Sequence, residues 1–297
     1  MMVRCGKRPV IRNFERMSVY VYTPENELRD SIDHIWYYAM DELNCRSISI
    51  PFLHPELVFN LGDSFQVQAE GGSFDYTASG ALSGIYATPV TTSVRGRHRA
   101  MGVIFRPEGL YRLFGLPTWR FGMPVGMAEI MGVDEMQGLE AALLEEGTPE
   151  EKVRCLEKFL LRVARPEKMP SVVEDFLEAV RTEPLRKGRI KAYLRDAGHA
   201  PKQFIQAFKN AVGHTPQTYL QLVQVNKSVE LIAGCPGLSL TEVAYEQGFY
   251  DQAHFIRVFG KLSGITPSRY RRWVLAGQAH AAFPNTIFFE GNPVQFL

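Results

Sequence analysis

Two stretches of this chain, 51 residues apart, repeat one pattern of aromatic, glycine and proline residues. The first copy spans residues 203–219 and the second spans residues 254–270. Seven positions are identical at this constant offset: Phe204/Phe255, Ile205/Ile256, Phe208/Phe259, Gly213/Gly264, Thr215/Thr266, Pro216/Pro267 and Tyr219/Tyr270. Two copies are too few for a solenoid. The repeat instead predicts a tandem duplication of one small helical unit, and any fold of the chain must accommodate both copies.

The second copy carries the local signals of a helix-turn-helix unit. Ser239 is suited to cap a helix, and Glu242 three residues later completes a capping box. Gly248 supplies the positive φ that the turn requires, and Asp251 is suited to cap the following helix. Three apolar residues of that helix recur at i, i+4 and i+7, which predicts one buried stripe: Phe255, Phe259 and Leu262.

The opposite side of the same helix is polar and suits base edges. In the major groove, Arg pairs bidentately with guanine and Gln with adenine, and a methyl group suits a thymine contact. The outward positions are Gln252, Ala253, His254 and Arg257 in the second copy, and Lys202, Gln203 and Gln206 in the first. Lys202 also suits a phosphate contact, which sets register without reading sequence. The alternative is the solvated face of a small helical bundle. A polar residue at the matching position of both copies, Gln206 and Arg257, favours DNA reading.

The whole region beyond residue 170 is predicted to be helical. The pattern gives seven helices, over about 171–181, 189–196, 201–212, 216–233, 239–246, 250–262 and 267–275. The fourth is the longest and joins the two helix-turn-helix units. Such a bridge would let one chain place two recognition helices in successive major grooves, roughly 34 Å apart.

The N-terminal region has the texture of β-structure from about residue 18 to residue 105. Short runs bounded by glycine and proline predict strands over 19–22, 46–50, 57–61, 65–68 and 101–105. Helices are predicted over 26–39, from 106 to about Gly115, and over 133–146 and 149–164. We therefore expect an α+β protein with three parts. These are a β-rich domain with flanking helices over 1–165, an all-α domain over 166–276, and an apolar C-terminal segment over 277–297 that docks on one of the domains.

Charge and cysteine usage narrow the class of protein. Residues 170–276 hold 14 Lys and Arg against 9 Asp and Glu, whereas the remainder holds 19 against 23, so the helical region is basic and favours a polyanion partner. The four cysteines show no metal-like clustering, which fits a reducing compartment: Cys5, Cys45, Cys155 and Cys235. No apolar run is long enough to span a membrane, and the N-terminus lacks a signal-peptide core. We expect a cytoplasmic protein without membrane contact.

The second copy also resembles the signature of the AraC family of bacterial transcription regulators. That signature runs Ala, Gly-Phe, a short gap, Phe-x-Arg-x-Phe, Gly-x-Thr-Pro, and an aromatic followed by a basic residue. It is matched at Ala244, Gly248, Phe249, Phe255, Arg257, Phe259, Gly264, Thr266, Pro267, Tyr270 and Arg271. Gly260 departs from it, because the family usually has a basic residue there. The resemblance implies a seven-helix DNA-binding domain and assigns the base-reading roles to the seven outward residues named above.

The N-terminal half is similar to a subgroup of such regulators. The likeness rests on four segments, residues 35–37, 51–63, 82–84 and 102–109. In many relatives this part is a cupin-like β-barrel that binds a small effector or mediates dimerisation. Some related proteins carry a repair methyltransferase with a reactive Cys in a Pro-Cys-His-Arg setting, and none of the four cysteines has that context. The resemblance implies neither a cofactor nor particular effector-binding residues.

An enzymatic N-terminal domain is the least favoured alternative. His54 and Glu56 lie near Asn60 and Asp63, but the His-x-His spacing of a metal-binding cupin is missing, so we expect no metal site. His98 lies among three arginines and is either a group facing an acidic ligand or part of a solvated loop, and the loop is favoured. A metal-dependent cupin-type enzyme fused to a DNA reader is therefore kept only as a remote alternative.

A second alternative is a DNA-binding regulator whose N-terminal domain only contacts other proteins. Five aromatic residues either pack the core or line a pocket, and the core is favoured: Trp36, Tyr37, Tyr38, Phe52 and Phe59. We expect a sequence-specific transcription regulator and not an enzyme. Its partner is double-stranded DNA, and a small effector, a second copy of the chain and RNA polymerase remain open as further partners.

Overall fold

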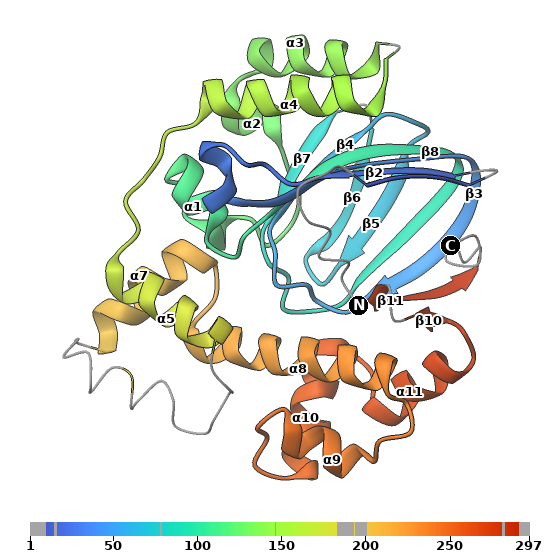
Figure 1. Ribbon diagram of the computed structural model, residues 1–297, viewed down its shortest axis with the longest axis vertical. Helices are drawn as coiled ribbons and strands as arrows, with labels where there is room; N and C mark the ends of the chain where they lie inside the picture. Colours follow the sequence, from blue (N-terminus) through green and yellow to red (C-terminus); the bar gives the residue numbers. More distant parts are fainter. Residues whose placement is uncertain are drawn as a thin grey trace.

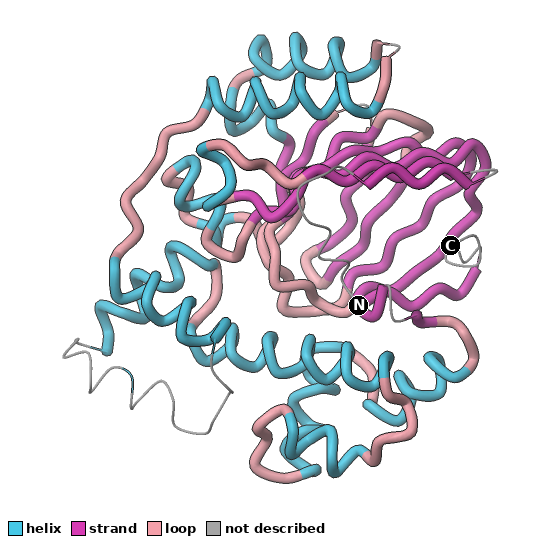
Figure 2. The backbone as a smooth tube through the Cα atoms, viewed as in Figure 1, coloured by secondary structure: helices cyan, strands magenta, loops and turns pink. Residues whose placement is uncertain are grey.

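The computed structural model describes residues 10–14, 17–77, 79–145, 147–182, 193, 201–280 and 283–290. The chain first forms a β-sheet with several helices of its own and then a region made only of helices. A final pair of strands returns to the sheet (Figures 1 and 2). We call residues up to 163, together with 279–290, the sheet half, and residues 171–275 the helical half. The fold is α+β, as the sequence predicts.

Two long antiparallel strands form the spine of the sheet. β3 (Ile32–Ser49) pairs with β8 (Val90–Phe105) along almost its whole length, with register shifts after Ile32 and after Met40. One end of β8 then pairs with β4 (Glu56–Asn60) and the other end with β5 (Phe65–Ala69). The remaining strands are β1 (Val10–Phe14), β2 (Met17–Tyr22), β6 (Gly72–Tyr76), β7 (Gly80–Ser83), β9 (Val125–Gly126), β10 (Ala279–His280) and β11 (Phe283–Glu290). Because two strands share one edge of β8, the sheet curls around its spine (Figure 1).

Helices cover one face of this sheet. They are α1 (Gly109–Phe114), α2 (Met127–Met131), α3 (Val133–Leu144) and α4 (Pro149–Val163), with short 3-10 turns η1 (Glu27–Asp30) and η2 (Thr118–Arg120) beside them. Leu57, Phe59, Met101 and Val103 point from the sheet into this layer and are almost fully buried. Alternate residues of the same strands point the other way, onto what we call the inner face. The sheet therefore has two separate apolar clusters, one on each face.

The helical half contains the duplicated unit. Its described helices are α5 (Ser171–Thr182), α7 (Pro201–Val212), α8 (Pro216–Gly234), α9 (Leu240–Glu246), α10 (Gln252–Ser263) and α11 (Pro267–Leu275). The repeated aromatics fill its core, with Phe204, Phe208, Phe255, Phe259 and Tyr270 at most 1% exposed. This explains why the same residue types recur at the same spacing. The predicted helix over 189–196 lies outside the described residues, except for Tyr193.

Buried polar contacts join the two halves. Asn226 of α8 donates to the carbonyls of Pro51 and Leu222, each at 2.9 Å, and accepts from the Asn285 amide at 2.8 Å. The carboxylate of Glu108, only 3% exposed, accepts from Arg181 of α5 at 2.6 Å. Apolar residues of the sheet half, including Ile50, belong to the same cluster as the helical core. The halves thus share one core and satisfy each other's polar groups.

The C-terminal strands return to the sheet half. β11 pairs antiparallel with β3, with Ile287 opposite Ile48, and β10 pairs with β11. The Tyr270 hydroxyl donates to the carbonyl of Pro284 at 2.7 Å, which links this segment to α11 as well. Ile287 is fully buried in the shared core. Among the described residues, no helix has the length and apolarity needed to cross a membrane.

One predicted element is wrong. The helix expected over 26–39 is a single 3-10 turn, capped by the Asn26 side chain, followed by strand β3. Residues 35–40 pair with β2 on one side and β8 on the other. Their ladder hydrogen bonds and two-sided burial outweigh the helix propensity of the preceding polar stretch. The strands predicted over 46–50 and 101–105 are the ends of the long β3 and β8, and the helices over 133–146 and 149–164 are confirmed within two residues.

Candidate nucleic-acid interface and the inner face of the sheet

The second helix-turn-helix unit consists of α9 and α10, and its caps are the predicted ones. The Ser239 hydroxyl accepts from the backbone N–H of Glu242 at 3.1 Å, and the Glu242 carboxylate accepts from the backbone N–H of Ser239 at 2.7 Å. Gly248 has a φ of +70° in the turn. The Asp251 carboxylate accepts from the backbone N–H of His254 at 2.7 Å. These bonds satisfy backbone donors that would otherwise be unpaired at both helix starts.

Helix α10 buries one side and exposes the other. The buried stripe is the predicted one: Phe255, Phe259 and Leu262. Of the four predicted base-facing residues, Gln252, Ala253 and Arg257 are exposed, and His254 is partly buried. The His254 ring packs against Phe249 with 5.7 Å between ring centroids, and its Nδ1 is buried without a hydrogen-bond partner. His254 therefore packs within the unit, while its three neighbours form the accessible surface.

The first unit presents α7 in the same way. Lys202, Gln203 and Gln206 are all exposed on it, opposite the buried aromatic stripe. The Gln206 side chain donates to Oδ1 of Asn210 at 3.0 Å, and the same oxygen accepts from the Trp119 indole at 3.3 Å. Trp119 belongs to η2 of the sheet half, so a residue from outside the unit contacts the exposed side of this helix. Nothing in the sequence spacing indicates this contact.

Helix α8 connects the two units. Thr215 caps it by accepting from the backbone N–H of Thr218 at 3.2 Å, and Pro216 occupies its first turn. Its 19 residues span about 28 Å at a rise of 1.5 Å per residue, which is shorter than the roughly 34 Å of one turn of B-DNA. Figure 1 shows α7 near one end of α8 and the α9–α10 unit toward the other.

Two exposed tyrosines flank the turn between α9 and α10, and the sequence patterns did not single them out. Tyr245, at the end of α9, is 82% exposed, and Tyr250, just before α10, is 72% exposed. Gln252 lies beside them, and its side-chain oxygen accepts from the Thr241 hydroxyl at 2.9 Å. The accessible face of the second unit therefore includes the turn as well as α10.

The inner face of the sheet carries a second group of polar and aromatic side chains. Across four neighbouring strands, His34, Ile104, Glu56 and Ser83 form one row of paired residues, and Trp36, Gly102, Val58 and Ala81 form the next. Position 102 has no side chain, and a Cβ there would lie 2.7 Å from the Trp36 ring. The indole therefore lies directly against the Gly102 backbone. We call His34, Trp36, Glu56, Tyr76, Ser83 and Tyr86 the inner-face cluster.

Glu56 is the charged centre of the inner-face cluster. Burial raises its pKa to about 7, although His34 and a hydrogen bond from Trp36 act in the opposite direction. Tyr76 and Tyr86 have raised pKa values, chiefly because of burial and in part because of the nearby Glu56 charge. Glu56 nevertheless keeps part of its surface accessible, as do Trp36 and Tyr86. The carboxylate is thus surrounded by protein, although the residue as a whole is not fully buried.

The structure corrects the expectation for His98. It lies in β8, not in a solvated loop, and its ring contacts Tyr38 and Phe65 at centroid distances of 5.5 and 5.2 Å. Burial lowers its pKa to about 4, and its Nδ1 has no hydrogen-bond partner. The sequence did not show this because His98 alternates with three outward-pointing arginines.

The five aromatic residues considered in the sequence fall into three environments. Phe59 is in the core and Tyr37 packs beside it, Trp36 and Tyr38 lie on the inner face, and Phe52 is 45% exposed.

The residues considered as metal ligands are not brought together. His54 Nδ1 lies 2.9 Å from the carbonyl of Phe105, and the Asp63 carboxylate accepts from the backbone N–H of Arg97 at 2.8 Å. Asn60 donates to backbone carbonyls instead. In the described part of the chain, no three His, Cys, Asp or Glu side chains are arranged to hold a metal ion.

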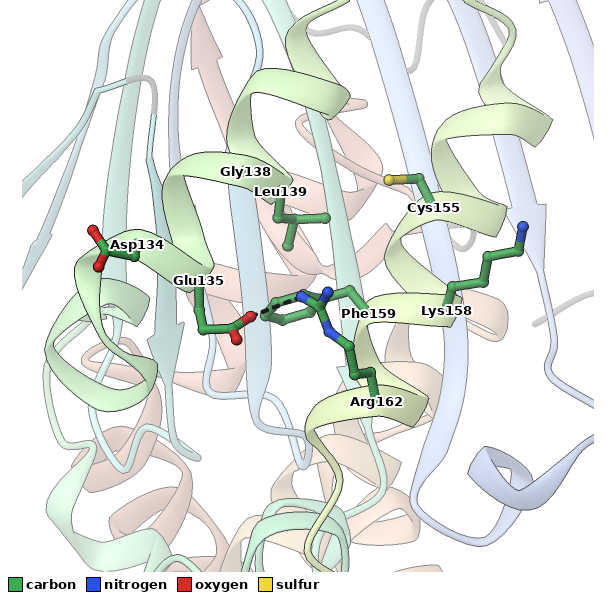
Figure 3. A pocket seen from close by; sticks show the side chains of 8 residues that line it. All are labelled: Asp134, Glu135, Gly138, Leu139, Cys155, Lys158, Phe159 and Arg162. Carbon is green, nitrogen blue, oxygen red and sulfur yellow. Dashed lines mark hydrogen bonds and ion pairs between the residues drawn. The ribbon is translucent and has the colours of Figure 1, made fainter.

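Two open grooves lie elsewhere on the sheet half. One, of about 570 Å³, runs between α3 and α4 and is crossed by an ion pair of 2.7 Å between Glu135 and Arg162 (Figure 3). The other, of about 400 Å³, is lined by parts of β3, β5, β6 and β8, including Arg46, Asp75 and Arg95. Both contain charges of each sign, so neither selects a ligand of one charge.

Comparisons with known proteins agree with this division. A family model described as a helix-turn-helix domain matches residues 193–272, and one described as a domain of unknown function (DUF6597) matches residues 20–122. The comparison with curated protein sequences gives no match.

The solved structures that match this chain have low sequence identity and low TM-scores. The C-terminal domain of AraT, a response regulator from Geobacillus stearothermophilus, is 20% identical over 36% of this chain and 88% of its own, with a TM-score of 0.34. ToxT from Vibrio cholerae is 10% identical over 87% of this chain and 98% of its own, with a TM-score of 0.46. Ectoine synthase from P. lautus is 9% identical over 32% of this chain and 67% of its own, with a TM-score of 0.26.

The helix-turn-helix match coincides with the duplicated unit, and the signature from Ala244 to Arg271 lies within it. With α9 and α10 folded as a helix-turn-helix pair and α7 repeating the buried stripe of α10 on the other side of α8, residues 193–272 contain a helix-turn-helix domain of the type that carries the AraC signature.

Proposed function

We propose that this protein is a DNA-binding transcription regulator of the AraC family that reads a two-part DNA site by placing α7 and α10 in successive major grooves, with the DNA-binding unit over 166–276. The observation that carries the proposal is that both helices expose polar residues at matching positions while burying the same aromatic stripe. Helix α8, about 28 Å long against the roughly 34 Å between adjacent grooves, is the bridge between them. In this arrangement the base-facing residues are Lys202, Gln203 and Gln206 on α7 and Gln252, Ala253, His254 and Arg257 on α10.

Arg257 is the proposed residue with the largest share of specificity. It is exposed on the outward side of α10, and its guanidinium is suited to a bidentate contact with a guanine. Gln252 and Gln206 suit adenine, and the methyl group of Ala253 suits thymine. Lys202, at the start of α7, suits a phosphate.

Selection from a randomised duplex library with the full-length protein tests the proposal. We expect one motif with two elements about ten base pairs apart. Arg257→Ala should then cost about 1–3 kcal/mol at one base pair and relax specificity there. Lys261→Ala, an exposed cation one turn further along α10, is the matched control and should weaken binding to all sequences alike. Equal discrimination by wild type and Arg257→Ala would refute the assignment, and recovery of a single short element would refute the two-helix mode.

The sheet half is proposed to control DNA binding through a small effector. Support comes from the inner-face cluster, where a few polar groups converge within an apolar wall and remain partly accessible, as in small-molecule sites. The alternative is a sheet half that only contacts a second copy of the chain. Analytical ultracentrifugation with and without operator DNA distinguishes the two. A dimer whose DNA affinity responds to no small molecule would favour the alternative.

A further inference from the structure

We propose that the inner-face cluster binds an organic cation, an amine or a quaternary ammonium compound, and that its occupancy reaches both helix-turn-helix units through residues 84–89. This inference rests on the proposed effector control and names the class of ligand. It follows from three features: the charge at the centre of the cluster, the aromatic rings around it, and the segment that leaves it.

The charge at the centre is a carboxylate without a cationic partner of its own. The groups that favour its charged form are His34 and the Trp36 indole, and within the described part of the chain no Lys or Arg forms an ion pair with Glu56. Ser83 stands opposite Glu56 on β7, but its hydroxyl donates to the Glu56 backbone carbonyl at 3.4 Å rather than to the carboxylate. A buried carboxylate in this state gains most from a bound cation, because that cation removes the cost of its burial.

The rings around the carboxylate suit the same ligand. The Trp36 ring lies against Gly102 beside the Glu56 row, and the Glu56 charge contributes to the raised pKa values of both Tyr76 and Tyr86. Aromatic faces attract cations through the ring quadrupole, most strongly where water is excluded. An anion would be repelled by Glu56, and a neutral ligand would leave the charge uncompensated. An organic cation satisfies both the carboxylate and the rings.

The segment that follows β7 connects the cluster to the DNA-binding units. Ser83 and Tyr86 belong to the cluster, and Ile85 between them contributes its carbonyl to His214, whose Nε2 lies 2.7 Å away. His214 stands between α7 and α8, at the end of the first unit. Further along the segment, the Pro89 ring would lie 3.1 Å from a Cβ at Gly264, which ends α10 of the second unit. One segment of six residues thus touches the ends of both proposed reading helices.

The geometry gives a direct route for regulation. A cation held between Glu56 and Tyr86 fixes the position of Tyr86, and therefore that of the adjacent Ile85 carbonyl. Because His214 and Gly264 are contacted from the same segment, a shift of it changes the placement of α7 and α10 together. The protein with and without bound cation should therefore differ in affinity for the two-part DNA site. The factor of this change equals the factor by which bound DNA changes the affinity for the cation.

The test uses the full-length protein and three probes, tetramethylammonium, choline and n-butylammonium, with 3,3-dimethyl-1-butanol as the neutral isostere of choline. Binding is measured by thermal shift and by tryptophan fluorescence at about pH 8, above the pKa of about 7 of Glu56. We expect saturable binding of at least one cation and none of the alcohol. Glu56→Gln, which keeps size and shape, should weaken the cation at least about tenfold.

A second variant tests the route. His214→Leu removes the contact with the Ile85 carbonyl and lies outside the proposed base-facing residues. It should bind the cation as wild type does, but the cation should no longer change its DNA affinity. Binding of none of the three cations, or equal binding by wild type and Glu56→Gln, overturns the ligand class. Retained coupling in His214→Leu overturns the route. Sequence-specific DNA binding is also measured in the absence of any cation. Loss of that binding would contradict the proposed function and not the ligand class.

Discussion

Asn226 offers the sharpest test of how the two halves are held together. Its side chain is 6% exposed and makes three hydrogen bonds, one to Pro51 of the sheet half, one to Asn285 of β11 and one within α8. Asn226→Ala removes all three and leaves buried partners unsatisfied. At about 0.5–1.5 kcal/mol each, the loss is roughly 1.5–4.5 kcal/mol. The better helix propensity of Ala offsets about 0.5 kcal/mol of this, so we expect a net loss of about 2.5 kcal/mol, within a range of about 1–4 kcal/mol.

The matched control is Ser228→Ala on the same helix. Ser228 is also buried, but its hydroxyl donates to the carbonyl of Gln224 at 2.7 Å, within α8. Its replacement should cost about 1 kcal/mol or less. Both variants are measured by urea unfolding of the full-length protein with tryptophan fluorescence, using the shift in midpoint at constant slope. If Asn226→Ala is destabilised no more than Ser228→Ala, the contact between the halves does not stabilise the fold as argued.

Three further outcomes are expected. The pKa of Glu56 is about 7 in the folded protein against an ordinary 4.5, so folding favours the protonated form of its carboxyl group. The contribution of this group to the unfolding free energy is therefore fully present below about pH 4.5 and is lost as pH rises through about 7. Glu56→Gln should remove that decline, on the order of 3 kcal/mol, in urea unfolding at a series of pH values, and an unchanged pH slope would contradict the assignment. Arg181→Leu strands the buried Glu108 carboxylate and should lower the unfolding free energy by about 3 kcal/mol, the low end for a buried pair because Arg181 is 37% exposed. Adding Glu108→Leu should restore part of this loss, and no restoration would point to packing instead. Thr266→Ala removes the cap of α11 and should cost about 1 kcal/mol by thermal unfolding, whereas Thr266→Ser should cost little.

The helical half could be predicted well because its signals are local. Caps such as Ser239 and Thr266 lie within three residues of the groups that they bind, and the aromatic stripe follows the helical period. The sheet half was predicted less well because its structure depends on distant partners. The stretch after Asn26 looks helical until β2 and β8 pair with it. No local pattern reveals that residues 283–290 add a strand to β3.

The candidate sites show the same limit. The exposed positions on α7 and α10 follow from helical periodicity, so the outward residues were found, although their contacts with bases remain predictions. The inner-face cluster depends on the register of four strands, which brings together Trp36, Glu56 and Tyr86 from separate parts of the sequence. Glu56 did attract attention from the sequence, but as a metal ligand beside His54. The pairing of β4 separates the two, because His54 turns to the Phe105 carbonyl.

The contact between Trp119 and Asn210 has a consequence for the chemistry of α7. An indole N–H only donates, so Asn210 must turn its oxygen toward Trp119, and Gln206 then has only its amide nitrogen to offer that oxygen. The Gln206 oxygen and one remaining N–H are left to face outward. In the major groove, adenine offers one donor and one acceptor, whereas guanine offers two acceptors. A tryptophan that belongs to the sheet half thus orients a side chain of the proposed reading helix so that it complements adenine and disfavours guanine.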